Sequence, residues 1–344
     1  MASEDAFGQF VARVRAQVDG RLATWLDGRV TSLGGGDMGA IAEALRSLVM
    51  RGGKRLRAVL LAASYEGCRG EGGSLAVSAA GAALELLQAY LLVHDDWMDG
   101  DDVRRGGPSV PAMMRERLPA YADAASVLAG DLASAWAQES LLELELPPAR
   151  VLLAARELAR MQREVIHGQV LDVASHARDA REVEAMYALK TASYTVRGPV
   201  VMGARLAAAS EARVAALAAF AQPLGVAFQL RDDVLGTFGD PRVTGKPAGS
   251  DLLKGKRTAL LVDALGDARA AEALRRVLGR PEASEAEHRA AVAAVEASGA
   301  RARVEERIDT LTREARAALE RADLTSEGLM LMEKAVVALT ERES

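Results

Sequence analysis

The sequence has a single cysteine, Cys68, so it can form neither an intramolecular disulfide nor a thiolate metal cluster. No basic run with interleaved aromatic residues is present, and the net charge of −5 makes nucleic acid an unexpected partner. Residues 1–5 lack the basic and then apolar layout of a signal peptide. The most apolar stretch, 79–93, is too short to span a bilayer and contains Glu85. These absences predict a cytoplasmic protein with no membrane span.

Aromatic residues make up only 4% of the chain, and strand-like alternation never persists for more than a few residues. Half of the residues are hydrophobic and 26% are charged, which allows a sizeable core. Apolar residues recur instead with helical period from residue 10 onward. Breaks fall at Gly34-Gly35-Gly36, at Pro147-Pro148 and around 239–249, but no linker separates domains. We therefore predict one all-α domain spanning residues 1–344.

Two predicted helices, 78–93 and 215–230, are apolar nearly all round, as expected of helices buried in a large helical core. Each ends in acid: His94 to Asp99 in the first, and Arg231-Asp232-Asp233 in the second. Burying clustered carboxylates is unfavourable unless a metal or cations compensate their charge. The acidic groups therefore predict a cation-binding function.

Asp95 and Asp99 are four residues apart, so on a helix they project from one face and can bind the same cations. Asp96 lies about 100° away and suits a supporting role, and so does His94. Ligation by carboxylates alone favours Mg²⁺ or Mn²⁺ over zinc. Magnesium usually bridges to substrate phosphate oxygens, so a diphosphate or triphosphate is the implied ligand.

Basic residues are spread through the sequence in short groups that could bind such an anion directly. The groups are Lys54-Arg55-x-Arg57, Arg104-Arg105, Lys190-Thr191, and Lys246 with Lys254 and Lys256. Interleaved acidic and basic groups indicate two anions, one bound through metal and one bound directly.

At these residues the sequence resembles the trans-isoprenyl diphosphate synthases, which include the farnesyl and geranylgeranyl diphosphate synthases. The resemblance is most specific over residues 52–258. Its marks are Gly53-Lys54-Arg55-Leu56-Arg57, Asp95-Asp96-Trp97-Met98-Asp99 with Arg104-Arg105-Gly106, Gly130-Asp131, Gly168-Gln169-x-x-Asp172, Lys190-Thr191-x-x-Tyr194, and Gln229-Leu230-Arg231-Asp232-Asp233 with Thr244-Gly245-Lys246. It implies a homodimeric helical bundle of about ten or more helices around a deep central cavity.

The resemblance also implies a role for each site residue. Metal ligands would be Asp95, Asp99 and Asp232, supported by Asp96 and Asp233, and would hold three Mg²⁺ ions, with Mn²⁺ as a substitute. The allylic diphosphate would contact Arg104, Lys190 and Lys246. Isopentenyl diphosphate would be held by Lys54, Arg57, Arg105 and Gln88. Thr191 and Gln229 would line the reacting centre, and Lys256 would help to close the site. The two acidic groups would then face each other across an apolar shaft.

The second acidic motif departs from the family pattern, because Gly236 stands where a third aspartate is expected. Asp240 or Asp251 could substitute through water, so we expect weakened but not abolished metal binding. Tyr90 lies five residues before Asp95, roughly 7.5 Å along a helix, where a bulky ring would limit product length. The resemblance implies a short product, and because the first acidic motif carries no insertion we expect twenty-carbon geranylgeranyl diphosphate, with fifteen-carbon farnesyl diphosphate as the alternative.

Two other functions are compatible with parts of the sequence. A terpene cyclase shares the acidic motif but has no use for the second anion site that Lys54, Arg57 and Arg105 predict. A non-catalytic regulatory subunit would not need Asp95, Asp99, Asp232 and Lys190 to be intact. A condensing prenyltransferase accounts for all of these residues.

Overall fold

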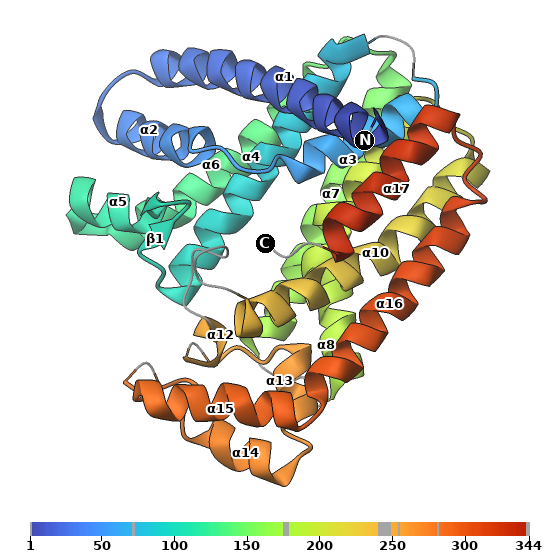
Figure 1. Cartoon of the computed structure of the whole chain (residues 1–344). Coiled ribbons are helices and arrows are strands. Elements are labelled where there is room, and N and C mark those ends of the chain that lie inside the picture. The colour runs from blue at the N-terminus through green and yellow to red at the C-terminus, as the bar shows by residue number, and fades with distance from the viewer. Residues whose placement is uncertain are drawn as a thin grey trace. The chain divides into compact units, whose positions relative to one another are not determined.

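The structure is a computed structural model that describes residues 2–70, 73–174, 179–239, 249–253, 255–280 and 282–341. Figure 1 shows that nearly every element of it is a helix, so the predicted all-α class is confirmed. The helices are α1 (Ala2–Leu33), α2 (Gly36–Met50), α3 (Leu56–Gly67), α4 (Gly73–Asp99), α5 (Val110–Arg117), η1 (Pro119–Tyr121), α6 (Ala122–Leu142), α7 (Pro148–Val173), α8 (Ala180–Tyr187), η2 (Ala188–Arg197), α9 (Gly198–Leu206), α10 (Glu211–Phe238), α12 (Ser250–Leu253), α13 (Ala259–Ala264), α14 (Ala268–Arg275), α15 (Glu285–Ala297), α16 (Ala300–Leu319) and α17 (Ser326–Thr340). A two-residue ladder pairs β1 (Val103–Arg104) with β2 (Gly107–Pro108).

The helices group into two compact units that interleave along the chain. The N-terminal unit comprises Met1–Ala159, Pro199–Ala209 and Leu324–Gly328, and the C-terminal unit comprises Arg160–Gly198, Ser210–Asp323 and Leu329–Ser344. Each unit carries one of the two acidic groups. The prediction of one domain over residues 1–344, and that of facing acidic groups, stay predictions.

In the N-terminal unit, α4 is the central buried helix. Its residues from Ala76 to Leu87 are all buried, as the apolar pattern predicts, and it packs against α1, α3 and α6. Gly81 allows the close approach of α1 and α3, because a Cβ there would lie 2.9 Å from Val18 and 3.0 Å from Ala58. The helix continues to Asp99, six residues beyond the predicted apolar run, so the first acidic motif forms its last turns.

In the C-terminal unit, α10 packs along α16 and η2 (Figure 1). Ser210 caps its start by accepting a hydrogen bond from the Arg213 amide at 3.3 Å. The helix runs to Phe238, eight residues beyond the apolar run 215–230, so Asp232 and Asp233 lie within it. Residues four apart, such as Gln229 and Asp233, can therefore meet on one face.

Two helical stretches, Ala76–Asp99 and Glu211–Phe238, are long and apolar enough to cross a membrane. The apolar window of the first is 83% buried and that of the second is 50% buried. Core helices of water-soluble proteins satisfy the same length and composition test. The burial of the first stretch fits such a core role.

Candidate diphosphate and metal site

The first acidic motif presents its three aspartates in different environments. Asp96 is fully buried, the Asp95 side chain is 25% exposed, and Asp99 is exposed. Asp95 and Asp99 share one face of α4, as their spacing predicts. They are thus the two carboxylates of this motif that solvent and a cation can reach.

The buried carboxylate of Asp96 binds Arg104. Arg104 donates to Asp96 Oδ1 from both Nε, at 2.7 Å, and Nη2. Burial raises the pKa of Asp96, and the hydrogen bond and charge of Arg104 offset this only in part. Asp96 Oδ2 is buried without a hydrogen-bond partner among the described residues. Asp96 therefore acts chiefly as an anchor for Arg104, which matches its predicted supporting role.

Arg104 is turned towards the acidic motif by a tight hairpin. Arg104 pairs with Gly107, which leaves Arg105 and Gly106 as the two turn residues, and both have positive φ (52° and 71°). Positive φ at both positions is typical of a type I′ turn. Arg51 braces the hairpin by donating to the carbonyl of Arg104 at 3.0 Å and that of Pro108 at 2.7 Å. The turn separates two consecutive arginines into different surroundings.

Arg105 belongs to a second, basic group. Burial lowers its pKa, and the positive charges of Arg55, Arg57 and Arg104 lower it further, while Glu85 acts in the opposite direction. The guanidinium stays charged at neutral pH, because arginine titrates far above that range. Its repulsion by neighbouring arginines makes this group a favourable place for a bound anion.

The loop that begins the basic group is held by a buried ion pair. Arg55 has a left-handed φ of 50° and donates to Glu85 Oε2 at 2.7 Å, to Asp19 at 2.8 Å and to the Val49 carbonyl at 2.9 Å. Glycines at 52 and 53 also have positive φ. The Arg55 side chain is therefore committed to the core.

The other predicted isopentenyl diphosphate ligands lie beside this loop in sequence or on α4. Lys54 is exposed, Arg57 is 8% exposed, and Gln88 is half-buried on α4, three residues after Glu85. Lys54 and Arg57 flank Arg55 within the same short segment. The charge of Arg57 acts on the pKa of Arg105, so the structure brings these two predicted ligands into one group.

In the C-terminal unit, Lys190 and Thr191 lie in the π-helical segment η2. Such segments are rare and frequently occur at functional sites. Lys190 Nζ forms an ion pair with Asp172 of α7. Gly168 permits this approach, because a Cβ there would collide with the Lys190 backbone. The family motifs at 168–172 and 190–191 are therefore packed against each other in the folded protein.

A chain of hydrogen bonds joins Thr191 to the second acidic motif. Thr191 Oγ1 donates to Gln229 Oε1 at 2.9 Å, and Gln229 Nε2 donates to Asp233 Oδ1 at 3.0 Å. The hydroxyl of Tyr187 donates to the other oxygen, Asp233 Oδ2, at 2.5 Å. Both oxygens of the buried Asp233 are thus occupied, which fits its predicted supporting role better than direct metal ligation.

The remaining predicted residues of this unit are less constrained. Asp232 is half-buried on α10 and Lys256 is exposed before α13, whereas Lys246 lies outside the described residues. The Gly236 carbonyl, where a third aspartate is expected, accepts from the Gly249 amide at 2.8 Å.

Magnesium fits the exposed carboxylates of the first motif. Within the described residues, no three His, Cys, Asp or Glu side chains converge into a ready-made metal cage. Mg²⁺ usually keeps several waters and binds through one or two carboxylates plus substrate phosphates. Asp95 and Asp99 on one helical face suit that mode, since each offers a hard oxygen ligand, and Asp95 Oδ2 lies 3.9 Å from Arg104 Nη2.

Tyr90 and His94, four residues apart on α4, pack edge to face just before the first acidic motif. Tyr90 is 7% exposed, and the two ring centroids are 4.9 Å apart at 71°. His94 Nε2 lies 3.0 Å from the Val127 carbonyl, and Gly130 leaves room for the imidazole. The His94 side chain is 22% exposed and packs between Tyr90 and α6, which is compatible with the predicted supporting role.

The sequence places Arg55 among the anion-binding basic residues and not in a core ion pair, and it assigns no role to Glu85 or Tyr187. Glu85 could have been found, because it is the only charged residue in the apolar run 79–93. Tyr187 gave no such signal, since a tyrosine on an amphipathic helix usually packs in the core.

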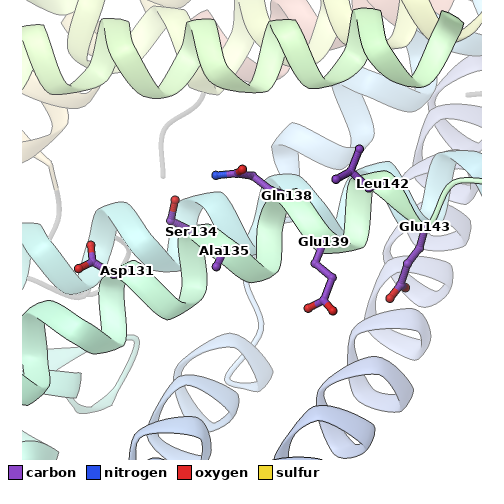
Figure 2. Close-up of a pocket in the computed structure, with 7 residues that line it drawn as sticks. All are labelled: Asp131, Ser134, Ala135, Gln138, Glu139, Leu142 and Glu143. Atoms are coloured by element: carbon purple, nitrogen blue, oxygen red, sulfur yellow. The ribbon is translucent and has the colours of Figure 1, made fainter. Parts of the chain in front are cut away.

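A separate hollow of about 680 Å³ lies along α6 in the N-terminal unit. Figure 2 shows its lining residues along that helix, namely Asp131, Ser134, Ala135, Gln138, Glu139, Leu142 and Glu143. Glu143 accepts hydrogen bonds from Trp25 at 2.8 Å and Arg29 at 2.6 Å. The hollow contains none of the predicted site residues.

The fold and these two groups of side chains define the isoprenoid synthase class of all-α proteins. Residues 39–295 match the family model described as polyprenyl synthetase, and the chain belongs to that family.

Individual relatives agree with this assignment. A geranylgeranyl diphosphate synthase of Methanosarcina mazei is 36% identical over 226 residues, which cover 64% of this chain and just under two thirds (66%) of that protein. A (2E,6E)-farnesyl diphosphate synthase of Mycobacterium bovis is 38% identical over 179 residues, 51% of this chain and 47% of that protein. The solved geranylgeranyl pyrophosphate synthase of Corynebacterium glutamicum, complexed with isoprenyl diphosphate and magnesium, is 33% identical with a TM-score of 0.89, over 96% of this chain and 99% of that one.

Proposed function

We propose that this chain is a magnesium-dependent trans-prenyltransferase that condenses isopentenyl diphosphate with an allylic diphosphate. One observation carries the proposal: the hairpin at Arg104-Arg105 gives one arginine to the acidic motif and the next to the Arg55–Arg57 group. Two neighbouring anion-binding groups suit a reaction with two diphosphate substrates. A terpene cyclase, which binds a single diphosphate, would leave the second group without a purpose.

The reaction begins when the carbon–oxygen bond of the allylic diphosphate breaks and its electron pair leaves with pyrophosphate. Asp95, Asp99 and Asp232 would hold magnesium, which would supply Lewis-acid stabilisation of that leaving group. Arg104 and Lys190 provide positive charge for the same oxygens, and Arg104 is already oriented by Asp96. The isopentenyl double bond then attacks the allylic cation, and loss of one proton restores an allylic double bond.

The second substrate is held without metal. Lys54, Arg57, Arg105 and Gln88 bind the isopentenyl diphosphate, while Arg55 remains bonded to Glu85 in the core. A buried guanidinium group that is repelled by its neighbours gains most from a dianionic ligand. The basic group therefore selects for the diphosphate.

The favoured product has twenty carbons, geranylgeranyl diphosphate, with farnesyl diphosphate as the alternative. Relatives with both names support a short product, and the buried ring of Tyr90 supports a limit on chain growth. Three Mg²⁺ ions, replaceable by Mn²⁺, and a cytoplasmic location belong to the same proposal.

We also propose that the protein is a homodimer. On α6 of the N-terminal unit, Leu128 is 54% exposed, and Leu142, which lines the hollow in Figure 2, is 65% exposed. Exposed apolar residues on one helix are typical of a protein–protein contact. Light scattering measures the molar mass of the purified chain in solution. The wild type should have the mass of a dimer, and a Leu128→Glu, Leu142→Glu double variant should have the mass of a monomer.

The decisive experiment incubates the purified chain with labelled isopentenyl diphosphate, Mg²⁺, and dimethylallyl, geranyl or farnesyl diphosphate in turn. A prenyltransferase extends at least one starter, and chromatography of the dephosphorylated product gives its length. Asp95→Asn is the matched loss-of-function variant. Cyclised hydrocarbon without elongation would indicate a cyclase, and no turnover by the chain alone would indicate a regulatory subunit.

A further inference from the structure

Tyr187 lies at the junction of α8, η2, α10 and α13 in the C-terminal unit. Its hydroxyl donates to Asp233 of α10 at 2.5 Å and accepts from the backbone amide of Ala259, at the start of α13, at 3.1 Å. Both side chains are buried, with exposures of 5% for Tyr187 and 3% for Asp233. The tyrosine thus satisfies a helix-start amide and a buried carboxylate at once.

The partners determine the direction of every proton in this chain of hydrogen bonds. A carboxylate only accepts, so Asp233 receives the proton of Tyr187 on one oxygen and the amide group of Gln229 on the other. Gln229 must then turn its carbonyl oxygen towards Thr191. The Thr191 hydroxyl consequently donates to Gln229, and the lone pairs of its oxygen remain as acceptors.

Burial supports this assignment. Burial raises the pKa of Tyr187 well above its usual value, and the adjacent Asp233 raises it further. The phenol therefore stays protonated at neutral pH and keeps donating its hydrogen bond to Asp233.

We infer that Tyr187 is a positioning residue of the condensation reaction. Through Asp233 and Gln229 it fixes the direction of the Thr191 hydroxyl, and it ties that arrangement to the start of α13. The inference rests on the proposed function, in which Thr191 and Gln229 line the reacting centre. Because the Thr191 proton points towards Gln229, the lone pairs of the Thr191 oxygen remain available as acceptors. They can stabilise a developing allylic cation without reorientation of the hydroxyl.

Removal of the Tyr187 hydroxyl alone tests the inference. In Tyr187→Phe, Asp233 loses the donor on Oδ2, so its carboxylate is held less firmly and the Gln229 side chain bonded to Oδ1 is less restrained. We expect kcat to fall about tenfold, equivalent to about 1.4 kcal/mol in the activation free energy. The KM for isopentenyl diphosphate and the magnesium dependence should stay within about twofold of wild type, because no ligand of either is changed.

A double-mutant cycle with Asp233→Asn separates positioning from simple stability. This substitution places an amide NH₂ group against one of the two donors, Tyr187 or Gln229, so it breaks the same chain of hydrogen bonds. The kcat values are measured at saturating Mg²⁺. If Tyr187 and Asp233 act as one unit, the kcat of the double variant should be about equal to that of the more impaired single variant. Additive losses in kcat would contradict the inference.

Leu274→Ala is the matched control for stability. Leu274 is fully buried on α14 in the same hydrophobic cluster, and its aliphatic side chain takes no part in the hydrogen bonds. At a temperature below all melting transitions, this variant should keep wild-type kcat.

The outcomes are distinguishable. A wild-type protein that condenses no substrate overturns the proposed function. An active wild type whose Tyr187→Phe variant retains full kcat overturns the positioning role alone, and so does a Leu274→Ala variant that loses as much kcat. If Tyr187→Phe does not fold, an Asp233→Asn variant with full kcat overturns the positioning role in its place.

Discussion

The Arg55 guanidinium and the Glu85 carboxylate form a buried ion pair, 2.7 Å long, with side-chain exposures of 1% and 2%. Glu85 Oε1 has no hydrogen-bond partner among the described residues, so Arg55 is the contact that compensates this buried charge most directly. The pair connects the loop that carries Lys54 and Arg57 to the central helix α4. It is therefore the structural support of the basic group.

Glu85→Gln should destabilise the protein strongly, because it leaves Arg55 buried without its main counter-charge. We expect a loss of about 3 kcal/mol in the free energy of unfolding, and a several-fold higher KM for isopentenyl diphosphate as Arg55 repels Arg105. Urea denaturation measures the first effect. Asp19→Asn is the control, since Asp19 binds Arg55 from a side chain that is 40% exposed and should contribute less than about 1 kcal/mol. Equal losses in both variants would contradict the assignment.

Asp232 and Asp233 should respond differently to magnesium. Asp232→Asn removes a proposed ligand and should raise the half-saturating Mg²⁺ concentration by more than about tenfold. Asp233→Asn should lower kcat but leave that concentration nearly unchanged, because Tyr187 and Gln229 occupy its oxygens. Magnesium titration of the activity distinguishes them. A parallel shift in both would make Asp233 a ligand.

Gly168→Ala should destabilise the protein and reduce activity, because the new Cβ would collide with the Lys190 backbone. Backbone cannot move aside as a flexible side chain can, so we expect a loss of about 2 kcal/mol or more. Gly20→Ala on α1 is the control. It has no atom within 4 Å of the new Cβ and should gain up to about 1 kcal/mol in helix propensity. Thermal melts of both variants give the comparison.

Tyr187 should remain protonated in alkaline solution for as long as the protein is folded. Because its folded-state pKa is raised, its contribution to stability is complete below the usual tyrosine value of about 10. That contribution is lost as the pH rises through the folded-state pKa. Ultraviolet titration should give the wild type and Tyr187→Phe equal phenolate signals up to alkaline unfolding, where the wild type gains one further tyrosine. A difference between the two folded proteins at a pH of about 10 would contradict this.

Tyr90→Ala should lengthen the product. The ring is buried on α4 roughly 7.5 Å from Asp95 along the helix, so its removal leaves room for further chain growth. Tyr90→Phe retains the ring and should leave the product unchanged. Chromatography of the prenyl alcohols from both variants decides the point, and an unchanged product from Tyr90→Ala would rule out the limiting role.

The sequence predicts the class of fold well, because helical period is a local pattern, whereas the identity of the site residues stays a prediction. Helical period marks α4 and α10, and the spacing of Asp95 and Asp99 places them on one face without tertiary information. The acids continue the helical hydrogen bonding, so the two helices include them and end at Asp99 and Phe238. The long-range partners were not predictable in this way. Arg55 and Glu85 are thirty residues apart, and Tyr187 and Asp233 are forty-six apart, so only the folded chain pairs them.

The N-terminal unit recruits two short segments from far along the chain. Ser64 of α3 donates to the carbonyl of Val200 at 2.6 Å, and the Thr325 amide donates to the carbonyl of Gly67 at 3.0 Å. During synthesis on the ribosome, the first 159 residues emerge long before these partners exist. The nascent chain therefore holds an unfinished apolar surface until these segments have been translated, and exposed apolar surface of this kind favours aggregation. Expression of residues 1–159 alone should accordingly yield aggregated protein.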